Sequence, residues 1–414
     1  MRLLVLVALA LFAASCYDAA DPTPTPTAAP TIAPAVQPSP GPPPPAPLPP
    51  EGVLYARPGG SRGQLIAYRQ GTGEVSHALP EGLLSADGNR FTAAEQGSKG
   101  TIVRSFDPRT GETLGRVVVD GLWRLVALSP SGRFAALGRV PLAAEEAAWR
   151  SEGRWETDLR TVDTLAGSAA RPFRLAGNYE VEAIAADGRA LFLVEHLPSL
   201  NPTHYQIRLF DLTAGQLTPS PLVDKGTEAV MAGQPWEGLP SSDGHWLLTP
   251  YLDTARGTAF IHALNLDDRF PACIDLPGGA STLDQVRAYA LLLASDNRTL
   301  FAINPTIGLI TIIDLSQYGV VTTIHFPPAT ARRPPGYARA IHSAVGETIY
   351  FTDGRGIWGY DVGQKHVSDP IAKLHSDIVG PGVSADGTRV YAATTTGAVS
   401  AFDVRSAQPA ALEP

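Results

Sequence analysis

Apolar and polar positions along this chain alternate in short runs that end at tight polar turns. The phrase SADGTRVYAA at 384–393 is the clearest case, because an apolar strand leads into Asp386-Gly387 and a second strand follows. Asp-Gly favours a hairpin, since glycine accepts a positive φ and the aspartate side chain bonds its own backbone. The pattern predicts repeated antiparallel strands. Weaker copies stand at 85–94, 129–138, 185–194, 241–250, 294–303 and 343–352.

A third strand follows each copy and ends in an apolar residue and an aspartate, or once an asparagine at Asn265. A second turn and a fourth strand follow in most copies, so each unit is a four-stranded antiparallel meander. The aspartates recur once per turn, and we expect them to bond backbone amides rather than to hold a metal or take part in catalysis. These structural turn residues are Asp87, Asp187, Asp243, Asp386, Asp107, Asp211, Asp314, Asp361 and Asp403.

The copies recur about every fifty residues, which is the length of one β-propeller blade. A twisted four-stranded sheet cannot bury both of its faces alone, whereas radial stacking buries them and leaves short edges. A β-sandwich would not repeat its turn chemistry in this way. We therefore expect an all-β fold, a β-propeller of seven or eight four-stranded blades. Eight is favoured because LIAYRQGTG at 65–73 is an extra third strand, which implies a partial blade at 53–80.

The last copy, SADGTRVYAATTTGAVSAFDVRS, resembles the YVTN-type propeller repeat, in which S-x-D-G-x-x-x-Y-V precedes an apolar-Asp strand and a Thr-Gly turn. The copy SPSGRFAALG is similar to the repeats of TolB-like propellers. The resemblance covers 53–414 and implies a propeller that usually has seven blades. Two enzyme classes of this fold match less well. The catalytic His, Arg and Glu of lactonases find no matching motif, and Gly115 and Pro219 stand where quinoprotein dehydrogenases repeat a tryptophan.

The N-terminus has the pattern of an export signal. Arg2 precedes ten apolar residues at 3–12, a stretch too short to span a bilayer, and small residues follow up to Cys16. These small residues before a cysteine resemble the lipobox of bacterial lipoproteins, although Ala13 stands where that family usually has leucine. The resemblance implies a signal peptide at 1–16 and a lipid on Cys16. The alternative is ordinary signal cleavage with Cys16 incidental.

The next segment, 17–50, is rich in proline, threonine and alanine. Such a segment cannot bury a core and favours extended polyproline II, so we expect a disordered stalk. At its full extension it would hold the propeller domain at 51–414 roughly 100 Å from its anchor. Together these features predict an exported protein that is anchored to the outer face of the cell membrane by a lipid on Cys16.

Charge and cysteine content bear on which partners and which disulfides the protein can have. The net charge of -8 disfavours nucleic acid as a partner. Cys273 is the only other cysteine, so we expect no internal disulfide and read Cys273 as a small buried apolar residue.

The stretch 139–150 is the one that predicts a helix. Nine scattered histidines contain no pair at metal-ligand spacing, and we expect neither metal nor cofactor. GGSRG at 59–63 matches a nucleophile motif, but a strand-like segment follows it instead of a helix.

The segments between the second and third strands, and between blades, vary most and are expected on the side of the disc opposite the repeated turns. Variable loops on a rigid scaffold usually carry binding, and Trp, Tyr and Arg are favoured interface anchors. The alternative is that these aromatic residues only cap the core. The candidate binding face comprises Trp149, Trp155, His204, Trp236, Arg332, Arg333 and Tyr337.

The sequence thus favours a non-catalytic, surface-tethered monomer that binds a protein or an extracellular glycan through this face. One alternative is an exported hydrolase or lyase that acts on a sugar derivative at the central channel, and another is a scaffold subunit of an envelope complex. A pocket with a perturbed acid-base pair would favour the enzyme, whereas a flat aromatic surface would favour binding.

Overall fold

The structure is a computed structural model that describes residues 52–58, 60–170, 172–223, 231–278, 280–329, 340–342, 347–407 and 409–410. The chain divides into two units, Met1–Leu48 and Pro49–Pro414, and all of the described residues belong to the second. Cys16 and the expected stalk therefore lie outside the described residues. Among the helices of the described part, none is both long and apolar enough to cross a membrane.

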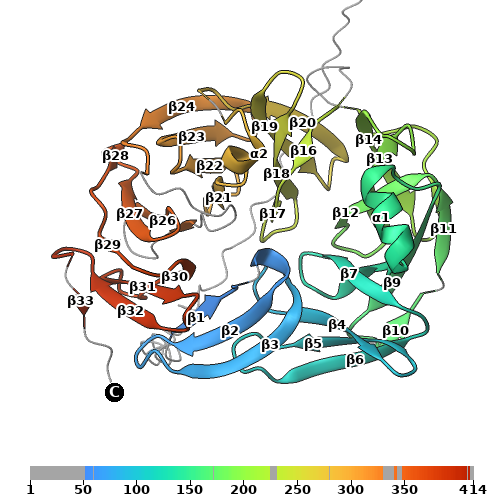
Figure 1. Ribbon diagram of the computed structural model, residues 1–414, viewed down its shortest axis with the longest axis horizontal. Helices are drawn as coiled ribbons and strands as arrows, with labels where there is room; N and C mark the ends of the chain where they lie inside the picture. Colours follow the sequence, from blue (N-terminus) through green and yellow to red (C-terminus); the bar gives the residue numbers. More distant parts are fainter. Residues whose placement is uncertain are drawn as a thin grey trace, which may run out of the picture. The chain divides into compact units, whose positions relative to one another are not determined.

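The described residues form antiparallel sheets arranged around a ring, which is a β-propeller (Figure 1). Seven sheets are present in this part of the chain. The first sheet contains β1 (Val53–Ala56), β2 (Gln64–Arg69), β3 (Val75–Leu84), β4 (Phe91–Gly97), β5 (Gly100–Phe106) and β6 (Thr113–Val119). The second contains β7 (Trp123–Leu128), β8 (Phe134–Arg139), β9 (Glu156–Asp163), β10 (Ser168–Ala169) and β11 (Phe173–Ala176). The third contains β12 (Asn178–Ile184), β13 (Ala190–Leu197), β14 (His204–Asp211) and β15 (Gln216–Leu217).

The remaining sheets complete the ring. The fourth contains β16 (Gln234–Pro235), β17 (Leu239–Pro240), β18 (Trp246–Asp253), β19 (Thr258–Asn265) and β20 (Phe270–Asp275). The fifth contains β21 (Ala290–Leu293), β22 (Thr299–Asn304), β23 (Leu309–Asp314) and β24 (Gly319–His325). The sixth contains β25 (Ala340–His342), β26 (Thr348–Thr352), β27 (Gly356–Asp361), β28 (His366–Val367) and β29 (Ala372–Lys373). The seventh contains β30 (Ile378–Val383), β31 (Arg389–Thr394), β32 (Val399–Asp403) and β33 (Pro409–Ala410).

The expected all-β propeller is confirmed, but the preference for eight blades is wrong. Residues 53–80 do not form a separate blade, because β3 joins them to the sheet that follows. Its first part pairs with β2, up to the contact between Gln64 and Glu81, and Gly82–Leu84 pair with β4. The chain passes from one partner to the other without a turn. The extra third strand in the sequence therefore belongs to a six-stranded first sheet.

The ring closes where the first sheet meets the seventh. Strands β1 and β30 lie side by side, and the backbone N–H of Arg57 donates to the carbonyl oxygen of Val379 at 3.0 Å. Gly380 makes this approach possible, since a Cβ there would lie 2.3 Å from the carbonyl oxygen of Tyr55. The closing contact is thus a backbone-to-backbone contact that needs a residue without a side chain.

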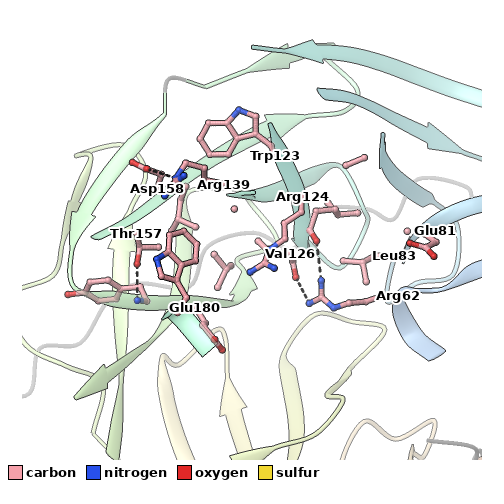
Figure 2. Close-up of a pocket in the computed structure, with 18 of the residues that line it drawn as sticks. Arg62, Glu81, Leu83, Trp123, Arg124, Val126, Arg139, Thr157, Asp158 and Glu180 are labelled. Atoms are coloured by element: carbon pink, nitrogen blue, oxygen red, sulfur yellow. Dashed lines mark hydrogen bonds and ion pairs between the residues drawn. The ribbon is translucent and has the colours of Figure 1, made fainter. Parts of the chain in front are cut away.

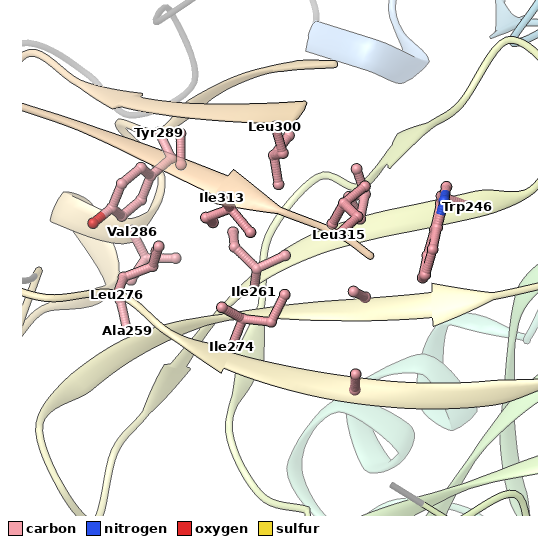
Figure 3. Packing of buried hydrophobic residues seen from close by; sticks show 14 of the residues in the cluster. Trp246, Ala259, Ile261, Ile274, Leu276, Val286, Tyr289, Leu300, Ile313 and Leu315 are labelled. Atoms are coloured by element: carbon pink, nitrogen blue, oxygen red, sulfur yellow. The ribbon is translucent and has the colours of Figure 1, made fainter. Parts of the chain in front are cut away.

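The core is divided into clusters of buried side chains, most of which lie between neighbouring sheets. Figure 3 shows the largest, where Ile261 of β19 packs against Ile313 of β23 and both are fully buried. The middle of β22, at 300–303, is apolar at every position because it is covered on both faces. Burial of each large apolar side chain contributes about 1.5–3 kcal/mol. All of these clusters belong to Pro49–Pro414, so a chain that lacks the N-terminal unit retains its core.

Two further expectations can be compared with the structure. The predicted helix at 139–150 is present as α1 (Ala143–Ser151), which begins after Pro141 and is capped by Glu145 accepting the backbone N–H of Leu142 at 2.8 Å. Two short elements were not expected, α2 (Leu283–Val286) and the 3-10 turn η1 (Gly60–Arg62). Cys273 is exposed, not buried, because it lies on β20, the outermost strand of the fourth sheet.

Candidate functional site

The repeated aspartates lie in tight turns and accept backbone N–H groups. In the first turn of the seventh sheet, Asp386 Oδ1 accepts the N–H of Thr388 at 3.0 Å and the hydroxyl of Ser384 at 2.6 Å. These hydrogen bonds and their equivalents in the other sheets stabilise the turns, and the aspartates that make them line neither of the two cavities described below. The corresponding backbone bonds are made by Asp87, Asp107, Asp187, Asp211, Asp243, Asp314, Asp361 and Asp403.

The residues predicted for a binding face are dispersed. Trp149 on α1 is half-buried and lines a cavity, and Trp236 lines a second one. Trp155 is 69% exposed and His204 stands at the start of β14, and neither lines these cavities. The other three predicted residues, Arg332, Arg333 and Tyr337, lie outside the described residues.

Charged side chains project from the inner strands of the second and third sheets, which lie nearest the centre of the ring (Figure 1). On β7 the exposed Arg124 stands between the buried residues Trp123 and Leu125, as the alternation of a strand requires. On β12 Glu180 is exposed, and Glu182 follows two residues later at a β-bulge that interrupts the regular alternation of the strand. The inner strands therefore place Arg124 and Glu180 on the exposed side, whereas Glu182 is buried.

A cavity of about 490 Å³, here called the arginine cavity, lies among these strands (Figure 2). Its walls come from β3, β4, β7, β8, β9, β12, η1 and α1. Its charged lining residues are Arg62, Arg124, Arg139, Arg154, Glu81, Asp158 and Glu180. Four arginines against three carboxylates leave a surplus of one positive charge, in a chain whose net charge is -8.

Arg139 is the one arginine of this cavity that is neutralised by carboxylates. It lies 3.0 Å from Glu145 and 3.1 Å from Asp158. The Trp149 ring lies between two cations, with the guanidinium of Arg139 5.0 Å and that of Arg154 5.1 Å from its centroid. These contacts fix α1 and its tryptophan at the edge of the cavity.

The other three arginines form no ion pair within the described part of the chain. Arg62 donates to two backbone carbonyls of β7, both at 3.0 Å, and Arg154 donates to the carbonyl of Tyr179. Arg124 forms neither a hydrogen bond nor an ion pair among the described residues. Figure 2 shows the side chains of Arg62 and Arg124 beside each other, with Glu180 nearby.

The charges of these groups influence one another. Loss of surrounding water lowers the pKa of Arg62 and of Arg154, and the positive charge of Arg124 lowers both further, while Glu180 opposes the effect. The pKa of Glu180 is lowered, chiefly by His196, whose Nε2 lies 3.6 Å from its carboxylate, while burial opposes the shift and the charges of Arg154 and Arg124 add to it. The Glu180 side chain is nevertheless 63% exposed, so solvent reaches the middle of the cluster. An anion that entered here would meet three cations and one carboxylate.

A second cavity of about 440 Å³, here called the apolar cavity, shares a wall with the first. Most of its lining is apolar and comes from the inner parts of the first four sheets, with Trp236, Trp246 and Leu247 among its residues. Glu182 is its most deeply buried carboxylate, with a side chain that is only 7% exposed. Burial, together with the charge of Glu180, raises the pKa of Glu182 to about 8.

The surroundings of Glu182 are partly aromatic. Its Oε1 lies 3.7 Å from Nε2 of the fully buried His262, and its Oε2 has no hydrogen-bond partner among the described residues. The rings of Tyr251 and His262 lie 5.5 Å apart. At neutral pH the raised pKa keeps the Glu182 carboxyl protonated, so it can donate a hydrogen bond or a proton into the apolar cavity.

Sequence reasoning did not find Arg62, Arg124, Arg154, Glu180 or Glu182. The sequence does contain one signal for such residues. The strand before each Asp-Gly turn is the inner strand of its blade, so a charged residue on it is a candidate for the centre of the ring. Charged residues at alternating positions there, as in WRLV and YEVE, have no place in a packed core and must face the centre. Arg62 stands in the GGSRG segment, where the arginine and not the serine contributes to the cavity.

The fold defines the class of protein as a β-propeller. Three solved structures can be compared with this chain. Dihydro-heme d1 dehydrogenase NirN, in complex with DHE, is 16% identical over 87% of this chain and 72% of its own, with a TM-score of 0.52. Hydrazine synthase from Kuenenia stuttgartiensis is 13% identical over 77% of this chain and 94% of its own, with a TM-score of 0.43. The Dos1 propeller is 10% identical over 82% and 85%, with a TM-score of 0.48. No protein-family model and no curated protein matches the sequence. At such identities the likeness to NirN shows the fold alone.

Proposed function

We propose that this propeller is an exported binding protein, monomeric and tethered to the outer face of the cell membrane by a lipid on Cys16. Its ligand carries an acidic group, either free or as part of a protein or glycan, and the arginine cavity holds that group. The arginine cavity favours binding over catalysis because cations and an aromatic side chain line it. Trp149, which the sequence predicted for a binding face, stands at that edge.

One observation supports this function above the others. Arg62, Arg124 and Arg154 lie in a cavity without ion-pair partners among the described residues. Arginine guanidinium groups recognise carboxylate, sulfate and phosphate through parallel hydrogen bonds, and such charge-assisted bonds are stronger than neutral ones. Burial and, to a lesser extent, the positive charge of Arg124 lower the pKa of Arg62 and Arg154, so a bound anion would stabilise their charged forms.

The test uses the chain from residue 17 onward, which retains every cluster of the core. Citrate or sulfate should raise its melting temperature relative to chloride at equal ionic strength, because an anion that binds only the folded state stabilises it. Arg124→Ala should abolish the increase. Arg116→Ala, an exposed arginine on the outer strand β6, is the matched control and should retain it. An equal increase in both variants would show that the anions act elsewhere, and the proposed function would be lost.

The tether is tested separately. Wild-type protein should partition with membranes and carry an N-terminal lipid mass, and Cys16→Ala should be recovered without either property. Wild-type protein without a lipid mass, combined with Cys16→Ala protein that stays on the membrane, would rule the anchor out.

The buried Glu182 favours a second function, that of an exported hydrolase or lyase acting at the centre of the ring. A carboxyl with a pKa of about 8 beside a histidine can donate a proton at neutral pH. The test is hydrolysis of a sugar lactone followed as acid release. Turnover that Glu182→Gln abolishes would establish the enzyme, and a rate equal to that of buffer with wild-type protein would exclude this reaction.

A further inference from the structure

The two cavities are adjacent. Five residues line both of them, namely Arg62, Leu83, Val126, Glu180 and Val181. The guanidinium of Arg62 is anchored on the carbonyls of Leu125 and Val126, so it stands at the boundary between the cavities. A ligand held by Arg62 and Arg124 on one side therefore lies next to the apolar cavity on the other.

The lining changes character across this boundary. On the side of Arg124 it is dominated by charges, whereas beyond Val126 it consists mainly of apolar and aromatic side chains, including Trp236 and Leu247. Water in an apolar space makes few hydrogen bonds, so an apolar group that displaces it gains free energy. Pockets of about 300–1,000 Å³ with apolar walls and few polar groups are typical sites for small molecules.

Glu182 provides one polar contact inside the apolar cavity. Its side chain is more than nine-tenths buried, and Oε2 lacks a hydrogen-bond partner among the described residues. A buried polar atom without a partner is costly, so a ligand atom that accepts a hydrogen bond here would satisfy it. This observation is independent of the arginines and points to an occupant in the same place.

We propose that the ligand is a small amphipathic anion, whose acidic group binds Arg62 and Arg124 and whose apolar body occupies the apolar cavity. The proposal rests on the proposed binding function and specifies the chemistry of its ligand. A purely ionic ligand would leave the apolar cavity unused, and a purely apolar one would leave the arginines without an ion-pair partner among the described residues. Only a molecule with both parts matches both walls.

The experiment compares three probes on the chain from residue 17 onward. Anilinonaphthalenesulfonate has an acidic group and an aromatic body, phenylnaphthylamine has the body without the acidic group, and methanesulfonate has the acidic group without the body. The first two fluoresce more strongly in an apolar site, and the third is measured as a competitor. The complete probe should bind about tenfold more tightly than phenylnaphthylamine and roughly a hundredfold more tightly than methanesulfonate.

Variants locate the two contacts. Arg124→Ala should weaken anilinonaphthalenesulfonate about tenfold and leave phenylnaphthylamine unchanged, because only the first probe carries the charge. Leu247→Gln should weaken both dyes. Arg116→Ala and Leu114→Gln are the controls, since both residues lie on β6 away from the cavities, and Leu114 is 44% exposed. Neither control should change the affinity of either dye.

The outcomes distinguish the proposed anion-binding function from the narrower proposal of an amphipathic ligand. If methanesulfonate competes as well as the complete probe, the cavity binds anions alone, so the amphipathic ligand is refuted while the proposed function stands. If Arg124→Ala binds anilinonaphthalenesulfonate as tightly as wild-type protein, the dye lies on another surface and the amphipathic ligand is again refuted. If citrate and sulfate also bind wild-type protein and Arg124→Ala equally, the proposed binding function is refuted together with the amphipathic ligand.

Discussion

Replacing Glu182 with glutamine should change how the stability of the fold depends on pH. Glutamine has nearly the same shape as glutamate but carries no titratable proton. The Glu182 side chain is only 7% exposed, and burial together with the charge of Glu180 raises its pKa from 4.5 to about 8. The difference between the two proteins therefore isolates the titration of one buried carboxyl.

The sign follows from proton binding in the two states. The unfolded chain releases the Glu182 proton as the pH rises past 4.5, whereas the folded chain retains it up to about pH 8. Between these values the folded state binds more protons, so the free energy of unfolding falls as the pH rises. Each pH unit in this window changes it by about 1.4 kcal/mol. From about pH 5 to about pH 7.5, wild-type protein should lose about 3 kcal/mol that Glu182→Gln retains.

The measurement is the melting temperature of both proteins across this pH range. An unfolding entropy of about 2.1 cal/mol/K per residue, applied to a propeller of about 360 residues, converts 3 kcal/mol into about 4 °C. The gap between the two melting temperatures should therefore widen by about 4 °C from low to high pH. Glu112→Gln removes an exposed carboxylate from a turn and controls for the loss of a negative charge. Curves for wild type and Glu182→Gln that stay parallel across the range would show that Glu182 titrates as an ordinary carboxyl, and the reasoning would be refuted.

Three further substitutions test the scaffold, each by denaturant unfolding. Phe192→Ala removes a fully buried ring between the third and fourth sheets, and the free energy of unfolding should fall by about 3–5 kcal/mol. Ser241→Ala removes the acceptor of the buried N–H of Trp246, at 2.9 Å, and should cost about 1–3 kcal/mol. Gly380→Val should separate β30 from β1, since its Cβ would lie 2.3 Å from the carbonyl oxygen of Tyr55, and should cost more than Ser241→Ala. An unchanged midpoint in any of the three would contradict the packing that the structure describes.

The fold could be predicted because turns and strands are local features. Asp386-Gly387 and its copies specify a hairpin from adjacent residues, and the interval between copies specifies the blade. The number of blades could not be obtained in the same way. It depends on whether β3 ends near Pro80 or continues to Leu84, and no local signal separates these cases, because the strand changes partner without a turn.

The candidate site was harder to predict from the sequence because its residues are distant from one another in the chain. Arg62 lies in η1, between two strands of the first sheet, Arg124 lies in the second sheet and Glu180 in the third. Their proximity depends on the angle between sheets. Interface preferences drew attention to Trp149, which lines the arginine cavity. The same preferences selected Trp155, which does not line these cavities, since a residue type alone does not indicate which side of a loop faces the centre.

The scaffold and the candidate site use different residues. The aspartates in the turns bond backbone amides, and the apolar clusters between sheets carry the stability. Arg124, Glu180 and Glu182 belong to neither set, and burial of Glu182 works against folding at neutral pH. Residues that lower stability persist where another requirement retains them, because active and binding sites trade stability for chemistry. This conflict between local charge and packing is the strongest physical reason to locate the function at the centre of the ring, and it separates that site from the repeated turns that define the fold.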